Sequence, residues 1–332
     1  MDAFAQPKRP CTASVVIRTL NESEHLPRLL EALAAQKLGP GLQLETVVVD
    51  SGSTDDTIDI SRRFGCRIRH IRKEQFSFGF SLNVGCEFAT GDILAFVSGH
   101  CIPATDSWLA ELAAPLLDGV AQYSYGRQIG AETTKFSETQ IFAKYFPEHS
   151  MLPQEGFFCN NANAAITRAA WQRYEFDEGV TGLEDMELSR RLVDDGGKVA
   201  YVATAPVHHI HDETWAQVRH RYEREDLAMQ RIVPNLHVNA VDAARFFVSG
   251  VLNDVSVALS KRNLVQNAAG IVAFRAMQYF GTYRGSREHR KISQKMKERY
   301  YYPTPSRDHL GPEPEARDGE TAEQRRRRLS AI

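Results

Sequence analysis

The first hundred residues alternate between short apolar runs and amphipathic segments. The apolar runs have the length and composition of buried strands, and they cover residues 13–19, 44–50, 66–71 and 93–97. The segments between them place apolar side chains at helical spacing. This alternation predicts right-handed β-α-β crossovers and a mainly parallel sheet. Asn21 or Ser23 is expected to cap the first helix, and Ser53 or Thr54 the second.

The middle of the chain mixes helical and extended patterns, and long helical patterns dominate from about residue 212. The expected helices are 108–117 and 185–194, and the expected extended segments are 120–125, 163–166 and 199–202. We therefore predict an α/β domain over residues 10–230 and a helical C-terminal region over residues 231–302. Residues 303–332 are Pro-rich and charged, and are expected to form a disordered tail.

The composition is typical of an ordinary soluble protein. The chain has 332 residues, 42% hydrophobic and 25% charged, and its net charge of −2 does not favour a nucleic-acid partner. Its five cysteines are widely spaced without a CxxC pair, which favours reduced thiols and a cytoplasmic location. The N-terminus has no apolar signal core, and no run of 18 uncharged apolar residues predicts a spanning helix.

Two acidic positions suggest chemistry. Asp50 ends a predicted buried strand, and the carboxyl ends of parallel strands are where open α/β sheets bind ligands. Glu184 and Asp185 begin a predicted amphipathic helix, a place where acids also simply favour the positive helix end. A strand-end acid together with a later acid pair for proton transfer indicates an enzyme that uses a sugar nucleotide.

The segments VVIRTLNESEHL, VVVDSGSTDDT and GLEDMELSRRL, in this order, resemble the inverting family 2 glycosyltransferases of the GT-A fold. The resemblance covers roughly residues 12–230. It implies that Asp50 binds the nucleotide base and that Thr19 and Glu22 lie in the loop around the base and ribose. It also implies that Asp185 is the catalytic base, and that Glu184 seats the acceptor or tunes its neighbour.

The metal signature departs from the family. Where the family usually carries Asp-x-Asp, this chain has Ser98, Gly99 and His100. The resemblance to GT-A enzymes with Asp-x-His, the polypeptide GalNAc-transferases, implies His100 as a metal ligand and places Ser98 and Gly99 in the nucleotide-sugar site. His209 and His211 alternate, so in an extended segment both face the same side. A histidine after the acidic helix often completes the GT-A metal site, which implies Mn²⁺ or Mg²⁺, with nitrogen ligands favouring Mn²⁺.

Two further polar groups have open interpretations. The segment Gln217–Tyr222 is a weak match to the Gln-x-x-Arg-Trp box of processive synthases, and Arg221 or Arg219 is expected to approach the donor diphosphate. Three asparagines either bind sugar hydroxyls or satisfy buried backbone groups, namely Asn160, Asn161 and Asn163.

The sequence thus predicts a transferase of the hexosyltransferase type. It would move a sugar from a nucleotide-diphosphate sugar to a glycan or lipid-linked acceptor in surface polysaccharide synthesis. The alternative is a degenerate, non-catalytic protein that binds a sugar nucleotide. A sugar nucleotidyltransferase or a dinucleotide oxidoreductase is disfavoured, because the glycine-rich loop that each needs after the first strand is missing.

The C-terminal region has two interpretations. Residues 281–302 hold seven Lys or Arg against two Glu, next to Tyr300, Tyr301 and Tyr302. Basic residues with tyrosines suit an anionic lipid surface, which predicts a peripheral contact with the inner face of the cell membrane. The alternative is that the helices of this region only cover the catalytic domain.

Overall fold

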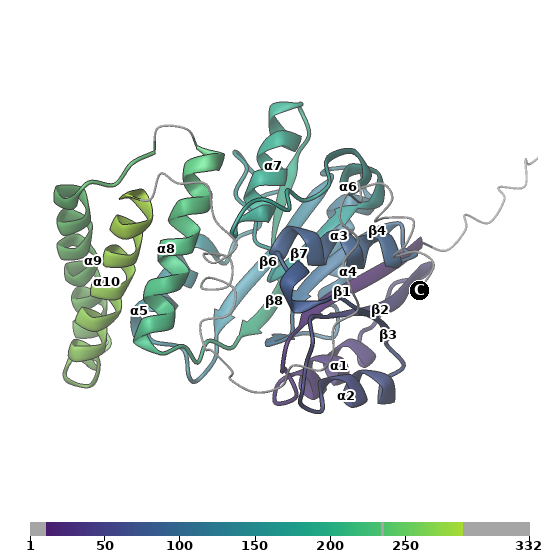
Figure 1. Cartoon of the computed structure of the whole chain (residues 1–332), viewed down its shortest axis with the longest axis horizontal. Helices are drawn as coiled ribbons and strands as arrows, with labels where there is room; N and C mark the ends of the chain where they lie inside the picture. The colour runs from purple at the N-terminus through teal and green to yellow at the C-terminus, as the bar shows by residue number, and fades with distance from the viewer. Residues whose placement is uncertain (1–10, 234–235, 288–332) are drawn as a thin grey trace, which may run out of the picture.

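The computed structural model describes residues 11–233 and 236–287 (Figure 1). Eight strands form a single sheet: β1 Cys11–Thr19, β2 Leu42–Asp50, β3 Arg67–His70, β4 Ile93–Ser98, β5 Cys101–Pro103, β6 Tyr123–Gly130, β7 Asn163–Thr167 and β8 Val199–His209. Their order across the sheet is β3-β2-β1-β4-β7-β6-β8-β5.

The N-terminal half of the sheet is parallel, as predicted. β1 pairs in parallel with both β2 and β4, and β2 pairs in parallel with β3. The other half is mixed, because β7 runs antiparallel to β4 and β6, and β5 runs antiparallel to β8. In the β1–β2 register Thr19 lies opposite Asp50, and in the β1–β4 register Arg18 lies opposite Ser98. The carboxyl ends of these strands therefore meet at one edge of the sheet.

Ten α-helices and a 3₁₀ turn lie within the described residues. They are α1 Leu26–Ala34, α2 Thr57–Arg63, the turn Lys73–Gln75, α3 Phe78–Phe88, α4 Trp108–Leu117, α5 Phe136–Tyr145, α6 Arg168–Tyr174, α7 Glu184–Asp194, α8 Trp215–Ile232, α9 Ala240–Ser260 and α10 Leu264–Arg287. Helices α1, α2 and α4 share one buried apolar cluster with the sheet, and α3, α5, α6 and α7 share the other. The result is a sheet covered on both faces, the predicted α/β architecture.

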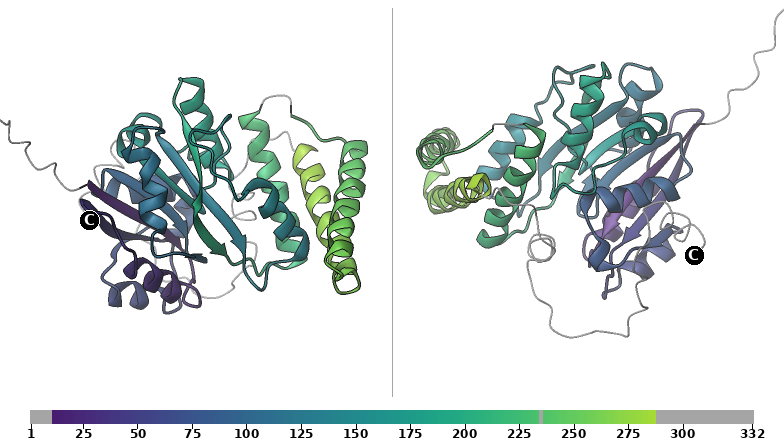
Figure 2. Two further views of the ribbon diagram at one scale, coloured as in Figure 1. Left: turned by 180° about the vertical axis from the view of Figure 1, so that it is seen from behind. Right: turned by 45° about the horizontal axis from the view of Figure 1, so that its top comes forward.

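Helices α9 and α10 form an antiparallel hairpin on the far side of α8 from the sheet (Figures 1 and 2). A Cβ on Gly281 or Gly285 would lie within 2.6 Å of a backbone oxygen of α8, so glycine permits the close packing of α10 on α8. Within the hairpin, Arg275 forms a two-pronged ion pair with Asp254, and both side chains are buried. Among residues 11–233 and 236–287, no helix combines the length and hydropathy needed to cross a bilayer.

The boundaries correct several expectations. The extended segment predicted at 199–202 continues to His209, because an apolar pattern also reaches through Ala205 and Val207. The segment predicted at 120–125 lies later, at Tyr123–Gly130. The predicted tail, 303–332, lies outside the described residues.

The helix caps were also assigned wrongly. α1 begins after His25 and α2 after Asp56. The polar residues expected to cap them instead connect the two loops that precede these helices.

Candidate active site

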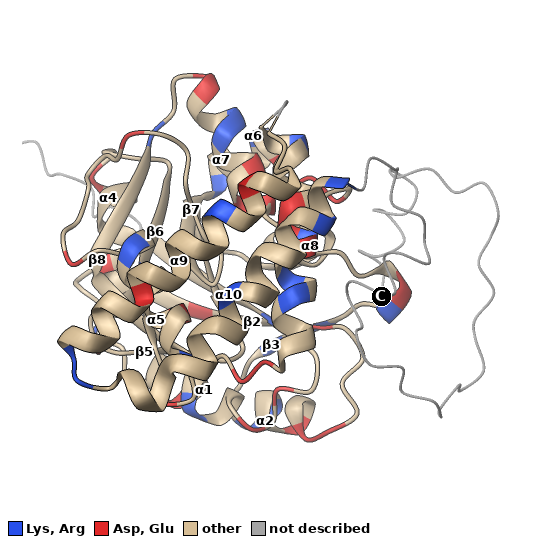
Figure 3. Cartoon of the chain, turned by 90° about the vertical axis from the view of Figure 1, so that its left-hand side faces the viewer, with Lys and Arg blue, Asp and Glu red and all other residues tan. Residues whose placement is uncertain are grey.

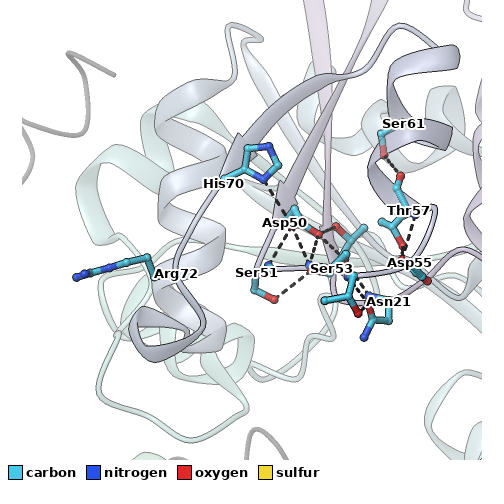
Figure 4. A network of polar contacts seen from close by, with 12 residues as sticks. Asn21, Asp50, Ser51, Ser53, Asp55, Thr57, Ser61, His70 and Arg72 are labelled. Carbon is cyan, nitrogen blue, oxygen red and sulfur yellow. Dashed lines mark hydrogen bonds and ion pairs between the residues drawn. The ribbon is translucent and has the colours of Figure 1, made fainter. Parts of the chain in front are cut away.

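Asp50 organises the loop that follows β2 (Figure 4). Its carboxylate is buried and accepts hydrogen bonds from the backbone N–H groups of Gly52 at 3.0 Å and Ser53 at 3.1 Å, and from the Ser53 hydroxyl. Thr19 donates to the same carboxylate at 3.2 Å, and His70 Nδ1 lies 3.5 Å away. Gly52 has a φ of +100°, which glycine adopts without strain and which makes the turn tight. The structure thus brings the predicted Asp50 and Thr19 together.

A second set of contacts joins this loop to the one after β1. The side-chain oxygen of Asn21 accepts from the backbone N–H of Thr54 at 2.8 Å. Asp55 accepts from the backbone N–H of Ser23 at 3.1 Å. Both loops that the sequence assigns to the nucleotide are therefore fixed to each other before any ligand binds.

Glu22 lies between this loop and the histidines. Its Oε1 is 3.1 Å from Nδ1 of His100. A Cβ on Gly99 would lie 2.9 Å from the Glu22 side chain, so a residue without a side chain is needed for this approach. Ser98, at the end of β4, hydrogen-bonds through its backbone N–H to Ala162. The predicted residues 98–100 thus reach the same edge of the sheet as Glu22.

The three predicted metal ligands converge. β5 and β8 pair antiparallel with Cys101 opposite His209, and the backbone N–H of Ile210 donates to the carbonyl of His100 at 3.1 Å. This pairing places one ligand atom from each of His100, His209 and His211 within 4.8 Å of the others. As predicted, His209 and His211 face the same side, with their Nε2 atoms 2.8 Å apart.

The hydrogen bonds around His209 fix its protonation. Ala162 N–H donates to Asn160 Oδ1 at 3.0 Å, so that atom is an acceptor, and Gln128 Nε2 donates to it at 2.9 Å. The oxygen of Gln128 therefore faces His209 Nδ1, at 2.7 Å, and this nitrogen must carry the proton. The Nε2 lone pair of His209 then points at His211.

His211 has the same arrangement. Its Nδ1 lies 2.7 Å from the carboxylate of Glu138, which makes Nδ1 the donor. Burial lowers the pKa of both His209 and His211, which opposes a proton shared between their Nε2 atoms. Two unprotonated nitrogens 2.8 Å apart are stabilised by a shared cation. The cluster therefore fits a divalent metal ion, with Glu22, Gln128 and Glu138 orienting the three imidazoles from behind.

Arg221 lies behind this cluster and is paired with two carboxylates. Its guanidinium donates to Glu213 at 2.7 Å and also to Glu138. Burial alone would raise the pKa of Glu138, but the hydrogen bond with His211 and the charge of Arg221 outweigh it and lower the pKa to about 2. In this structure Arg221 links α8 to His211 through Glu138, and its approach to a diphosphate stays a prediction. Arg219 lies beside His220, at 3.3 Å.

The acid pair begins α7, after Leu183 in a left-handed conformation with a φ of +55°. Asp185 is 6% exposed and accepts from the backbone N–H groups of Asn161 at 2.7 Å and Met186 at 2.8 Å. Burial and the neighbouring Glu184 raise the pKa of Asp185 to about 7, although these two N–H groups and Arg18 oppose the shift. A carboxylate with a pKa near neutrality suits general-base catalysis. Glu184 pairs with Arg18 at 3.4 Å.

The side chains of Asn160 and Asn163 make hydrogen bonds within the protein. Asn163 donates to the carbonyls of Arg127 and Ala205 and accepts from Trp108 Nε1, so its fully buried side chain ties strands together. Asn160 accepts from Gln128, as described above. Of the two interpretations that the sequence left open, the satisfaction of buried groups applies to both side chains.

Comparisons with known proteins agree with this fold. Residues 14–174 match the model of the family described as glycosyl transferase family 2. The O-antigen chain rhamnosyltransferase RfbN of Salmonella typhimurium is 26% identical over 222 residues, which cover 63% of this chain and 69% of that protein.

Two solved structures resemble the model. The mannosyltransferase PcManGT from Pyrobaculum calidifontis, in complex with GDP-Man and Mn²⁺, superposes with a TM-score of 0.56 at 15% identity, covering 88% of this chain and 87% of that chain. The glucosyl-3-phosphoglycerate synthase from Mycobacterium tuberculosis, in complex with Mn²⁺, UDP and glucosyl-3-phosphoglycerate, gives a TM-score of 0.51 at 22% identity, covering 69% and 83%.

The chain is therefore a glycosyltransferase with the GT-A fold. Residues 14–174, just under half of the chain, resemble glycosyl transferase family 2. The match to the family model ends before Glu184, so the acid pair and the histidines at 209 and 211 lie beyond the matched residues.

Proposed function

We propose that this enzyme transfers a sugar from a nucleotide-diphosphate sugar to a hydroxyl of a glycan or lipid-linked acceptor, with inversion, in surface polysaccharide synthesis. The observation that carries the proposal is the cluster of His100, His209 and His211 at the sheet edge that also bears Asp50. The cluster supplies a cation site where the usual Asp-x-Asp is missing. It favours catalysis over the alternative of a degenerate sugar-nucleotide-binding protein.

In the proposed reaction Asp185 accepts the proton of the acceptor hydroxyl as that oxygen attacks the anomeric carbon. The bond from the anomeric carbon to the nucleoside diphosphate breaks on the opposite face, and the diphosphate leaves. Asp50 and Thr19 hold the nucleotide side of the donor, next to Ser98 and Gly99. A divalent cation, Mn²⁺ or Mg²⁺, held by the three histidines would neutralise the charge of the diphosphate.

The names of related proteins support the donor and acceptor classes. RfbN is an O-antigen chain rhamnosyltransferase, and the two similar structures were solved with GDP-Man or UDP and with Mn²⁺. We extend to this chain the glycan acceptor class from the name of RfbN, and the nucleotide-linked donor and the divalent cation from the two solved structures.

A turnover assay distinguishes a catalytic transferase from a protein that only binds the sugar nucleotide. Purified protein is incubated with UDP-, GDP- and dTDP-sugars, with Mn²⁺ or EDTA, and release of the nucleoside diphosphate is measured with candidate acceptors. We expect one donor class to give Mn²⁺-dependent release that Asp185→Asn abolishes. Binding of a donor without any release, equal in wild type and Asp185→Asn, would contradict the proposal. Glu187→Gln, which changes a later acid of α7, is the matched control.

We further propose that the α9–α10 hairpin contacts the cytoplasmic face of the membrane. Of the basic segment 281–302, only residues up to 287 are described. The described hairpin adds an apolar stripe on α9, where Val241, Val248, Leu252 and Leu259 are 53–68% exposed and recur at spacings of seven and four. Three exposed cations lie on α9 or directly after it, namely Arg245, Lys261 and Arg262. Figure 3 shows Lys and Arg segments on this side of the molecule. Apolar groups flanked by cations suit an anionic lipid surface.

Vesicle flotation tests the contact. We expect the full chain to float with phosphatidylglycerol-containing vesicles at low salt and to be released by high salt. The double variant Val248→Glu/Leu252→Glu should reduce the floating fraction, whereas Leu117→Glu, at an exposed apolar position of α4, should not. Equal flotation of all three proteins, or none at low salt, would remove the membrane contact.

A further inference from the structure

Two arginines from distant parts of the chain meet on one aromatic ring beside the acid pair. The guanidinium carbon of Arg18, at the end of β1, lies 4.9 Å from the centroid of the Phe78 ring. The guanidinium carbon of Arg224, on α8, lies 4.7 Å from the same centroid. The two cationic groups are therefore less than about 10 Å apart, within reach of a single phosphate or diphosphate group.

Among the described residues, the two arginines together form one direct ion pair. Arg18 has Glu184 as its anionic partner, but at 3.4 Å, which is longer than the 2.7–2.9 Å of a strong charge-assisted hydrogen bond. Arg224 makes no ion pair with the described residues, and its buried Nε has no hydrogen-bond partner among them. Burial also lowers the pKa of Arg224, and outweighs the raising effect of the nearby charges of Glu225, Glu184 and Glu213.

The missing ion pair distinguishes Arg224 from another arginine on the same helix, α8. Arg221, one turn earlier, is also buried, but it is held by the carboxylates of Glu138 and Glu213. Arg224 instead lies against Gly182, where a Cβ would come within 3.5 Å of its Nε. A buried guanidinium N–H without a hydrogen-bond partner is costly, and an anionic ligand would supply that partner.

The position of Arg18 and Arg224 beside the acid pair indicates which ligand they bind. Arg18 contacts Glu184, whose neighbour Asp185 is the base in the proposed function and must face the acceptor hydroxyl. The donor diphosphate already has a proposed cation site at the three histidines. We propose that Arg18 and Arg224, supported by Phe78, form a subsite for a phosphate or diphosphate group of the acceptor. This inference rests on the proposed function, because it uses the assignment of Asp185 as base.

Binding of inorganic pyrophosphate in EDTA tests the subsite without catalysis and without the metal cluster. We expect Arg224→Met and Arg18→Met each to weaken pyrophosphate binding about 10-fold or more, since each removes a charge-assisted hydrogen-bond donor. Arg224→Lys should retain part of the affinity. Arg190→Met, on the outer side of α7, is the matched control and should bind as wild type does.

Nucleotide affinity and turnover of the variants distinguish a failure of the anion subsite from a failure of the proposed transfer reaction. Affinity for nucleoside diphosphate with Mn²⁺ should be unchanged in Arg224→Met. Equal pyrophosphate binding in wild type and both Met variants would overturn the subsite, and so would a parallel loss of nucleotide affinity, which would assign the arginines to the donor. If Asp185→Asn keeps full turnover while the pyrophosphate results hold, the assignment of the base fails and the anion site stands.

Steady-state kinetics with three acceptors identify the source of the phosphate. Arg224→Met should raise KM about 10-fold or more for a phosphate-bearing acceptor, either a phosphorylated glycan or a lipid-linked diphosphate sugar, and leave KM for a neutral glycan unchanged. The acceptor whose KM rises is the one that carries the recognised group. An equal change for all three acceptors would contradict the subsite.

Discussion

The pH dependence of catalysis follows from the burial of Asp185. Its pKa of about 7, against an ordinary value of 3.8, means that ionising this carboxyl in the folded protein costs about 4 kcal/mol more than in water. The base is then about half ionised at pH 7 and about a tenth ionised at pH 6. We expect kcat/KM to fall about 10-fold per pH unit below pH 6 and to level off above pH 8.

Replacing the base should lower kcat and remove the pH dependence of the rate. Asp185→Asn keeps one acceptor oxygen for the N–H groups of Asn161 and Met186, but it cannot take a proton. We expect kcat to fall by about 10²–10⁴ and the remaining rate to lose the acidic limb. Rates are measured by nucleotide release between pH 5 and 9. Glu187→Gln, on the same helix, should keep the wild-type profile.

Stability should change with pH in the opposite direction to activity. Because the folded-state pKa of Asp185 is raised, its contribution to stability is fully present below about pH 4 and is lost as pH rises towards 7 and beyond. The melting temperature of the wild type should therefore fall between pH 5 and pH 8 relative to Asp185→Asn. An acidic limb that persists in Asp185→Asn, or melting curves of both proteins that shift in parallel with pH, would refute the assignment.

Two further variants test other parts of the structure. His211→Ala removes one imidazole and the hydrogen bond to Glu138, and should weaken Mn²⁺ binding at least about 10-fold by calorimetry. His208→Ala, at an exposed position of β8, should bind as the wild type does. Arg275→Met should cost about 3–5 kcal/mol of unfolding free energy by denaturant titration, because it leaves Asp254 buried and unpaired. The double variant Asp254→Leu/Arg275→Met should recover most of that loss, and an additive loss would show that the pair is not coupled.

The sheet and its helices could be predicted because their signals are local. The apolar runs near β1, β2 and β4 and the helical spacing between them follow from backbone geometry, and β1 and β2 pair in parallel as expected. The end of β8 was predicted too early, because polar residues such as His208 alternate with apolar ones along the extended strand. The predicted caps are wrong because Ser53 accepts from the backbone N–H of Asn21 and Asn21 accepts from Thr54, and sequence does not reveal loop-to-loop contacts.

Sequence motifs also identified most residues of the candidate site, but not the residues that contact them from behind. Asp50, Asp185 and the histidines stand in recognisable segments. Glu138 and Gln128, which orient the imidazoles, lie in a helix and a strand without a motif, and Arg224 is one of several arginines on α8. Their roles depend on which elements pack together.

The sequence by itself therefore determined the sheet, its parallel half and the candidate acids and histidines. Only the tertiary structure decided that β5 pairs with β8, which brings His100 to residues more than a hundred positions away. It also decided that Asp185 is buried, which raises its pKa, and that Arg18 and Arg224 lie against one aromatic ring. Periodicity encodes local geometry, whereas pKa values and ligand clusters depend on distances between groups that the fold alone brings together.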